Sequence, residues 1–185
     1  LNCARGSALA FAGRTVCSVC TAGKFMADTG ATSCTDCPVG SFSDGERFVE
    51  CVSCGPGFVQ EKEGQTQCDA CVPGKYMGSS KQTSCLECPT GRYSTGNATE
   101  ECVQCLAGEY QDETGKTFCK ACGNGTYTPS KGLSTCFRCT TGYYQPSANT
   151  TACFPCAKGR FQEREQSSAC DDCPVGRFTT SDGVS

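Results

Sequence analysis

The stretch CTDCPVGSFSDGERFVEC, residues 34–51, contains the signals that decide the fold of this chain. Two cysteines separated by two residues are followed by Gly40, by Phe42 and, after a polar turn, by the next cysteine. The same order recurs along the sequence, because C-x2-C pairs and C-x13-C intervals alternate from Cys3 to Cys173 without an insertion or deletion. The chain is therefore an array of 17-residue C-x2-C-x13 repeats.

Three further positions keep this phase, and we number them from the second cysteine of each pair. The glycine position is the third residue after that cysteine and holds Gly6, Gly23, Gly40, Gly57, Gly74, Gly91, Gly108, Gly125, Gly142, Gly159 and Gly176. The aromatic position is the fifth and holds Phe25, Phe42, Tyr76, Tyr93, Tyr110, Tyr127, Tyr144, Phe161 and Phe178, with Ala8 and Val59 as exceptions. The turn position is the tenth and holds Gly13, Gly30, Gly64, Gly115, Gly132 and Gly183, with Arg47, Lys81, Ala98, Asn149 and Gln166 elsewhere.

The spacing predicts a small disulfide-rich all-β fold with almost no helix. Two short extended stretches around a turn fit between the cysteines, whereas a helix of about 10 residues does not. A glycine in every repeat indicates a positive φ angle or a close backbone approach. A 17-residue unit has no core of its own, so we expect each repeat to stack on the next in a linear, solenoid-like rod, with the aromatic positions forming a spine.

Composition excludes several classes of protein. The chain has 185 residues, 21 cysteines and no histidine, which excludes histidine-based catalysis and mixed cysteine–histidine zinc sites. Its net charge of −3 is scattered and gives no basic surface for nucleic acid. No apolar run is long enough to cross a membrane. No catalytic constellation recurs, so we predict that the protein is not an enzyme.

We expect residues 1–185 to form one continuous array of about eleven repeats, with partial modules at both ends and no separate globular domain.

Three disulfide patterns are compatible with the spacing. In the first, the second cysteine of one pair bonds the first cysteine of the next pair. In the second, like positions bond one repeat apart, which requires a 34-residue alternation that the sequence lacks. In the third, each C-x2-C closes on itself, as in redox sites. The spacing favours the first, which gives Cys3–Cys17, Cys20–Cys34, Cys37–Cys51, Cys54–Cys68, Cys71–Cys85, Cys88–Cys102, Cys105–Cys119, Cys122–Cys136, Cys139–Cys153 and Cys156–Cys170. Cys173 is left over, and we expect its partner at the end of the next C-x13-C interval, beyond this chain.

The C-x2-C pairs have two rival uses. Four thiolates from two pairs could hold zinc, but each metal would need two repeats and would therefore impose a 34-residue period. Thioredoxin-like exchange needs a C-x2-C motif near a βαβ pattern, which the sequence does not contain. Structural disulfides in an oxidising compartment are the favoured interpretation, with no metal and no cofactor apart from covalent glycans.

The repeat resembles the ephrin-receptor-like cysteine-rich repeat. Residues 34–42, CTDCPVGSF, and residues 85–93, CLECPTGRY, carry the resemblance best. The C-x2-G-x-[FY] opening is also similar to one module of the tumour necrosis factor receptor cysteine-rich domains. The resemblance covers the whole chain and implies loops closed by the first disulfide pattern, strung together in an elongated ectodomain.

Three of the four asparagines lie in N-x-[ST] sequons, at Asn97, Asn124 and Asn149. Such sequons are acceptors for N-linked glycans in secreted proteins, so we predict glycosylation of these residues. Asn149 also fills a turn position, where asparagine tolerates left-handed geometry, and this is a second reason for its presence.

A uniform module suits a protein whose length and stiffness matter more than a single binding site. We therefore predict a structural repeat of an extracellular filament, a cell-surface appendage or a matrix protein, exported by the secretory pathway. The expected partners are other copies, by self-association or head-to-tail continuation into a fibre, and other extracellular proteins or glycans. The alternative is the stalk or ligand-binding ectodomain of a single-pass receptor or adhesion protein. The chain begins and ends inside a module, so we expect it to be an excerpt of a longer polypeptide.

Overall fold

The computed structural model describes residues 2–9 and 16–184, so Gly13 lies outside the described residues. The described part of the chain contains short antiparallel β-hairpins and no helix, as the spacing predicted. Its contacts form two compact units. Unit 1 comprises Leu1–Leu86 and Gly96–Glu101, and unit 2 comprises Glu87–Thr95 and Cys102–Ser185. The single continuous array stays a prediction.

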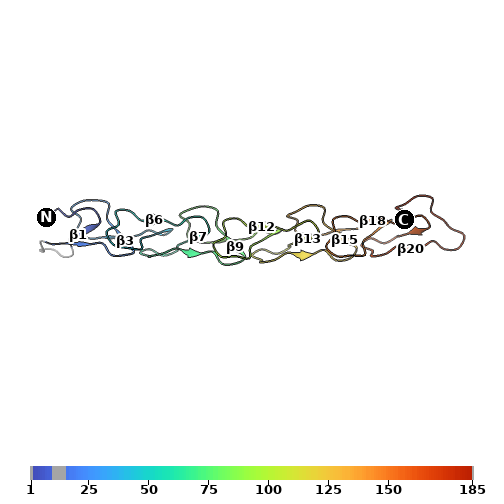
Figure 1. Cartoon of the computed structure of the whole chain (residues 1–185), viewed down its shortest axis with the longest axis horizontal. Coiled ribbons are helices and arrows are strands. Elements are labelled where there is room, and N and C mark those ends of the chain that lie inside the picture. Colours follow the sequence, from blue (N-terminus) through green and yellow to red (C-terminus); the bar gives the residue numbers. More distant parts are fainter. Residues whose placement is uncertain (1, 10–15, 185) are drawn as a thin grey trace. The chain divides into compact units, whose positions relative to one another are not determined.

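The hairpins of unit 1 follow one another in chain order (Figure 1). They pair β1 (Ser7–Leu9) with β2 (Cys17–Val19), β3 (Lys24–Phe25) with β4 (Thr35–Asp36), β5 (Ser41–Phe42) with β6 (Val52–Ser53), and β7 (Phe58–Val59) with β8 (Asp69–Ala70). The unit also contains β9 (Lys75–Tyr76). β10 (Leu86–Glu87) follows where the chain passes from one unit to the other.

Unit 2 repeats the same hairpin. It pairs β11 (Arg92–Tyr93) with β12 (Val103–Gln104), β13 (Glu109–Tyr110) with β14 (Lys120–Ala121), β15 (Thr126–Tyr127) with β16 (Phe137–Arg138), β17 (Tyr143–Tyr144) with β18 (Phe154–Pro155), and β19 (Arg160–Phe161) with β20 (Asp171–Asp172). In each of these hairpins the aromatic position lies opposite the residue that follows the next cysteine, as Tyr127 lies opposite Phe137.

The buried core of a repeat is not at the aromatic position, and the spine of aromatic positions stays a prediction. Phe and Tyr at the aromatic position are only half-buried, and Phe178 is 80 % exposed. We call the residue that follows the aromatic position the inner position. Nine side chains at the inner position are at most 9 % exposed: Met26, Ser43, Gln60, Met77, Ser94, Gln111, Thr128, Gln145 and Gln162. Successive strand residues point to opposite faces. The inner face is covered by the backbone of neighbouring repeats, which encloses unbranched or small side chains, while the rings lie on the outer face.

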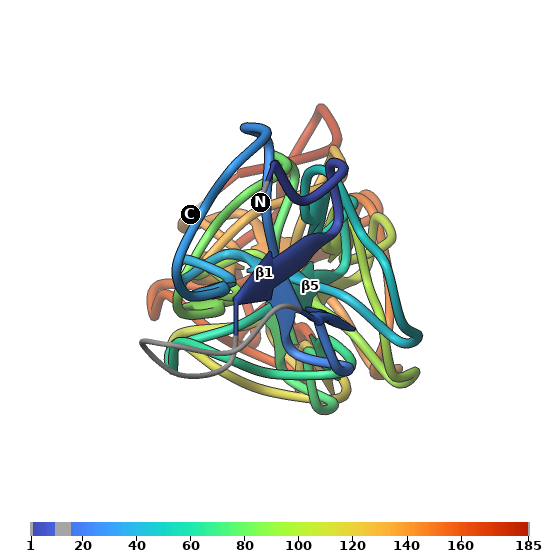
Figure 2. The same cartoon turned by 90° about the vertical axis from the view of Figure 1, so that its left-hand side faces the viewer.

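Neighbouring repeats are joined by backbone hydrogen bonds that recur in register. The N–H of the glycine position donates to the carbonyl of the inner position in the next repeat, as Gly40 N–H does to the Gln60 carbonyl (2.7 Å). The N–H of the inner position donates to the carbonyl of the residue after the next turn position, as Gln60 N–H does to the Gln82 carbonyl (3.0 Å). The N–H of the turn position donates to the backbone carbonyl of the second cysteine in the preceding repeat, as Lys81 N–H does to the Cys54 carbonyl (2.8 Å). Viewed from its N-terminal side, unit 1 has β1 and β5 near its centre, with its own blue and cyan loops around them (Figure 2).

The glycine position also packs against the backbone carbonyl of the turn position two repeats further along the chain. A Cβ atom on Gly40 would lie 2.5 Å from the carbonyl oxygen of Lys81, and one on Gly108 would lie 2.7 Å from that of Asn149. The same contact forms between Gly6 and Arg47, Gly23 and Gly64, and Gly57 and Ala98 in unit 1, and between Gly91 and Gly132, Gly125 and Gln166, and Gly142 and Gly183 in unit 2. Both expected reasons for glycine therefore apply, since these residues combine a positive φ angle with close backbone approach.

From Gly30 to Gly183, the turn position has a left-handed backbone whichever residue occupies it. Arg47, Lys81, Ala98, Asn149 and Gln166 have φ angles of 54° to 63°, close to those of Gly30, Gly64, Gly115, Gly132 and Gly183 at 69° to 75°. A left-handed conformation costs about 1–2 kcal/mol for a residue with a Cβ atom. The hydrogen bond from the turn N–H to the preceding repeat and the contact of its carbonyl with the glycine position hold the turn in this conformation.

Replacing Gly40 by alanine should lower the unfolding free energy by about 2 kcal/mol or more, because the new Cβ atom meets the Lys81 carbonyl at a positive φ angle. Gly55→Ala is the matched control. Gly55 has no positive φ, and a Cβ atom added to it would have no neighbour within 4 Å, so its replacement should leave stability unchanged or slightly raised. Urea unfolding of the oxidised chain measures both. Equal effects of the two variants would contradict the predicted contact.

Candidate functional site

The feature that recurs along the described chain, up to the repeat that begins at Cys173, is a disulfide that closes one hairpin. The structure contains Cys3–Cys17, Cys20–Cys34, Cys37–Cys51, Cys54–Cys68, Cys71–Cys85, Cys88–Cys102, Cys105–Cys119, Cys122–Cys136, Cys139–Cys153 and Cys156–Cys170. Their Cα atoms are 5.6 to 5.8 Å apart, within the usual range for disulfides. The bonds occupy the thiols that a zinc site would need. Cys173 is a free cysteine of intermediate burial, and its bond to a residue beyond the chain stays a prediction.

The two sulfurs of a disulfide lie in different surroundings. The cysteine that comes first in each disulfide, such as Cys37 or Cys54, is at most 1 % exposed, while its partner, such as Cys51, is in most repeats half-buried. The buried cysteine donates its N–H to the carbonyl of the preceding glycine position, as Cys54 does to Gly40 (2.9 Å). Each of these disulfides therefore anchors its hairpin at the point where the hairpin meets the preceding repeat.

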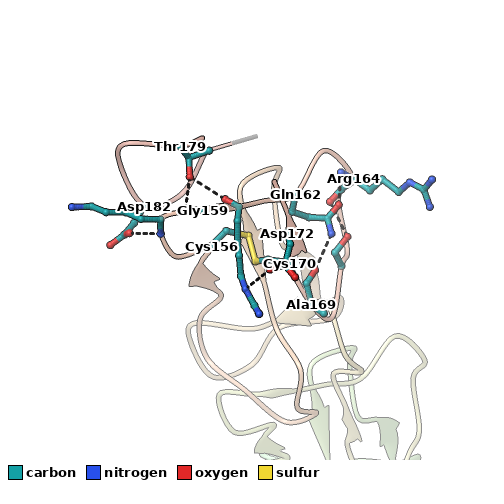
Figure 3. Close-up of a disulfide and its surroundings, with 12 residues drawn as sticks. Cys156, Gly159, Gln162, Arg164, Ala169, Cys170, Asp172, Thr179 and Asp182 are labelled. Carbon is teal, nitrogen blue, oxygen red and sulfur yellow. Dashed lines mark hydrogen bonds and ion pairs between the residues drawn. A yellow bond between two sulfur atoms is a disulfide. The ribbon is translucent and has the colours of Figure 1, made fainter. Parts of the chain in front are cut away.

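Glutamine at the inner position fastens its own loop. The Gln162 amide nitrogen donates to the Ala169 carbonyl (2.8 Å), and its oxygen accepts from Arg164 N–H (2.9 Å), next to the Cys156–Cys170 disulfide (Figure 3). Gln60, Gln111 and Gln145 make the same two bonds in their repeats. The amide satisfies two backbone groups in the loop that no strand pairing satisfies.

Other residues fill the same position in other ways. The Thr128 hydroxyl accepts from Gly108 N–H (2.7 Å) and donates to the Glu109 carbonyl (3.3 Å), so it bonds the preceding repeat instead of its own loop. The Ser43 hydroxyl donates to the Lys24 carbonyl (3.3 Å). Met26 and Met77 fill the position without any polar group. The position therefore selects for a side chain that fits, and a polar group there must find a backbone partner.

The inner position is not evident from the sequence pattern, because no single residue type recurs there. One signal could have found it: none of Leu9, Met26, Ser43, Gln60, Met77, Ser94, Gln111, Thr128, Gln145, Gln162 and Thr179 is charged. In a chain with 19 % charged residues, a position that stays uncharged through eleven repeats indicates burial.

An exposed ion-pair cluster lies on one loop of unit 2. The Lys120 ammonium donates to Asp112 (2.7 Å) and Glu113 (3.0 Å), and Lys116 pairs with Glu113 (2.7 Å). Hydrogen bonds from Lys116 and then Lys120 lower the pKa of Glu113 from 4.5 to about 2. The bond from Lys120 also lowers the pKa of Asp112. Because these folded-state values are depressed, the ion pairs are present above the unfolded pKa and are lost as the pH falls toward 2.

The three sequon asparagines are all exposed. Asn97 immediately precedes the turn position Ala98, and Asn124 lies in the turn before Gly125. Asn149 is itself a turn residue with φ of 60°, and its N–H donates to the Cys122 carbonyl (2.8 Å). Exposure is compatible with glycans at each site, and their attachment stays a prediction.

Among the described residues, no group of histidine, cysteine or acidic side chains is arranged to hold a metal ion. No helix in the described part of the chain is long and apolar enough to cross a membrane.

Comparison with family models identifies one match. The model for tyrosine-protein kinase ephrin type A/B receptor-like repeats matches four segments, residues 23–67, 40–78, 91–134 and 147–185. Together the segments cover most of the chain, and each contains the C-x2-C pairs and the glycine and aromatic positions. A search of curated proteins finds no match.

Gln60→Ala should lower the unfolding free energy by about 1–3 kcal/mol, because it leaves the Gln67 carbonyl and the Lys62 N–H without their buried partner. Gln60→Met should cost less, since methionine occupies the equivalent position in Met26 and Met77. Gln82→Ala, at an exposed side chain, is the control and should be neutral. Urea unfolding of the oxidised chain ranks the three, and an equal loss for Gln60→Ala and Gln82→Ala would contradict the assigned role.

Proteolysis of the unreduced chain, followed by mass spectrometry, should recover Cys37 linked to Cys51. A Cys34–Cys37 link, or a link between like cysteines such as Cys34 and Cys51, would contradict the pairing.

Proposed function

Since the chain belongs to the tyrosine-protein kinase ephrin type A/B receptor-like family, we propose that it is a structural segment of an extracellular filament, cell-surface appendage or matrix protein. Repeats of this family are non-catalytic extracellular modules. The family and the ten disulfides together indicate a location outside the cell or on its surface.

The observation that carries the proposal is the uniformity of the repeat. In each unit the glycine, inner and turn positions bond the adjacent repeat in the same register, with no inserted loop between the cysteines. Binding sites are usually formed by loops that vary on a constant scaffold. A chain in which every loop has the same length stacks regularly but lacks variable loops for binding. Such a chain suits a component that determines the length and stiffness of an extracellular structure.

The proposed mechanism is mechanical. Each disulfide closes a loop of about 15 residues and reduces the conformational freedom of the unfolded chain. The bonds between neighbours then make the stability of each repeat depend on the repeats beside it. Other copies are the proposed partners, by lateral association or by head-to-tail continuation, and glycans at Asn97, Asn124 and Asn149 would limit which faces can associate.

The second candidate function is the stalk or ligand-binding ectodomain of a single-pass receptor or adhesion protein. The family match favours it, because the description of the matching model refers to receptors.

Electron microscopy of the protein secreted from cells, at increasing protein concentration, distinguishes a filament segment from a receptor or adhesion ectodomain. We expect fibres of constant width that persist in non-reducing buffer and come apart in reductant, because the disulfides hold each repeat. Monodisperse monomers at every concentration, binding one soluble protein tightly, would contradict the filament and support the receptor ectodomain. Removal of N-linked glycans by an endoglycosidase is the control for glycan-mediated association.

A further inference from the structure

An open notch with a cavity volume of about 290 Å³ lies between two consecutive hairpins of unit 2. Tyr127 of β15 and Tyr143 of β17 line it together with Arg138 of β16, Thr140 and Ala152. The volume is at the lower end of the range for small-ligand pockets, so the notch accommodates about one ring with its substituents. We call it the tyrosine notch.

The aromatic walls of the tyrosine notch are held by their neighbours. The Tyr127 ring lies 5.8 Å from that of Phe137, its cross-strand partner, with an interplanar angle of 40°. Tyr143 lies opposite Pro155 in the β17–β18 pair, and a Cβ atom on the turn residue Gly183 would lie within 3.6 Å of both side chains. A ligand would therefore meet rings that are already positioned, at a smaller cost in conformational entropy.

The polar groups of the tyrosine notch are available to a ligand. Within the described part of the chain, the Arg138 guanidinium makes no hydrogen bond or ion pair, and neither do the side-chain hydroxyls of Thr140, Tyr127 and Tyr143. Arg160 in the same unit differs, because it pairs with Asp172 at 3.0 Å. The notch thus combines an unpaired cation, three hydroxyl groups and two aromatic walls.

These groups define the chemistry of the ligand. An unpaired guanidinium favours a carboxylate, which it binds with two parallel hydrogen bonds. Hydroxyl groups that both donate and accept suit a ligand rich in hydroxyls. Aromatic walls suit a flat apolar face. A uronic acid ring has all three features, whereas an acidic peptide side chain would leave the hydroxyl groups of the notch unmatched.

We propose that the tyrosine notch binds a uronic acid residue of an acidic polysaccharide. The carboxylate of the sugar pairs with Arg138, the C–H face of its ring lies against Tyr127 and Tyr143, and its hydroxyl groups bond Thr140 and the tyrosine phenols. The proposal names one glycan class among the partners of an extracellular chain. It rests on the extracellular location alone, so it holds for a filament and for a receptor ectodomain.

Unit 1 contains an equivalent notch that serves as an internal control. Its cavity volume is about 260 Å³, and Phe42, Gly55 and Phe58 line it at the repeat positions of Tyr127, Thr140 and Tyr143. Ser53 stands at the repeat position of Arg138. This phenylalanine notch has the aromatic walls but lacks the guanidinium group and the threonine and tyrosine hydroxyl groups, so it should not bind the acidic sugar.

The test is an NMR titration of the whole oxidised chain, isotopically labelled on backbone amides and aromatic rings. The probe is a tetrasaccharide of alternating glucuronate and N-acetylglucosamine. The neutral control is the tetramer of N-acetylglucosamine, and the peptide control is tetraglutamate. We expect shifts confined to the tyrosine notch, with both controls bound about tenfold more weakly or not at all. Arg138→Gln should weaken binding of the acidic sugar about tenfold or more, from loss of a charge-assisted pair.

Arg160→Gln is the matched variant, because it removes an arginine of the same unit that is already paired and does not line the notch. Arg160→Gln should leave the affinity for the acidic tetrasaccharide unchanged. Backbone amide chemical shifts that stay unchanged away from each substituted residue show that both variants fold. Absence of binding, equal affinity for the neutral tetramer, equal effects of the two arginine variants, or preference for the acidic peptide would each overturn the proposal. None of these outcomes bears on fibre formation, so the microscopy remains an independent test.

Discussion

The constraint on which the rest of the structure depends is the contact between the glycine position and the turn carbonyl two repeats further along. It requires a residue without a Cβ atom at one site and a left-handed turn at the other, and both sites must recur at a fixed interval. One inserted residue would shift the turn away from its glycine and break the backbone bonds made by the inner position. This explains why the sequence keeps a strict 17-residue period.

The disulfide and this contact have complementary roles. The disulfide acts within a repeat and closes its hairpin, so that each loop is ordered although it buries little apolar surface. The glycine contact and the backbone bonds act between repeats, and they place polar main-chain groups against one another where a larger protein would use an apolar core. Buried Gln111 and Gln145 continue the same principle, because the amide of each bonds two backbone groups of its loop.

Regular stacking also determines where recognition can occur. Because the loops have one length, differences between repeats arise from single side chains at equivalent positions. The notches of the two units have similar walls, yet the presence of Arg138 and Thr140 in place of Ser53 and Gly55 changes an uncharged notch into one suited to an anion. A repetitive scaffold of this kind can therefore carry a specific site without an irregular loop.

The sequence by itself determined the period, the scarcity of helix, the hairpin as the repeating element and the glycine position that combines a positive φ angle with a close backbone approach. Cysteine spacing and the recurrence of glycine are local signals, and they depend on short stretches of chain such as residues 34–51. Only the tertiary structure decided which side chains are enclosed. A ring such as Phe42 lies half-buried, because strand alternation turns it outward and the inner face holds the adjacent Ser43. The same holds for the tyrosine notch, since Tyr127 and Tyr143 belong to consecutive repeats and meet only when one repeat stacks on the next.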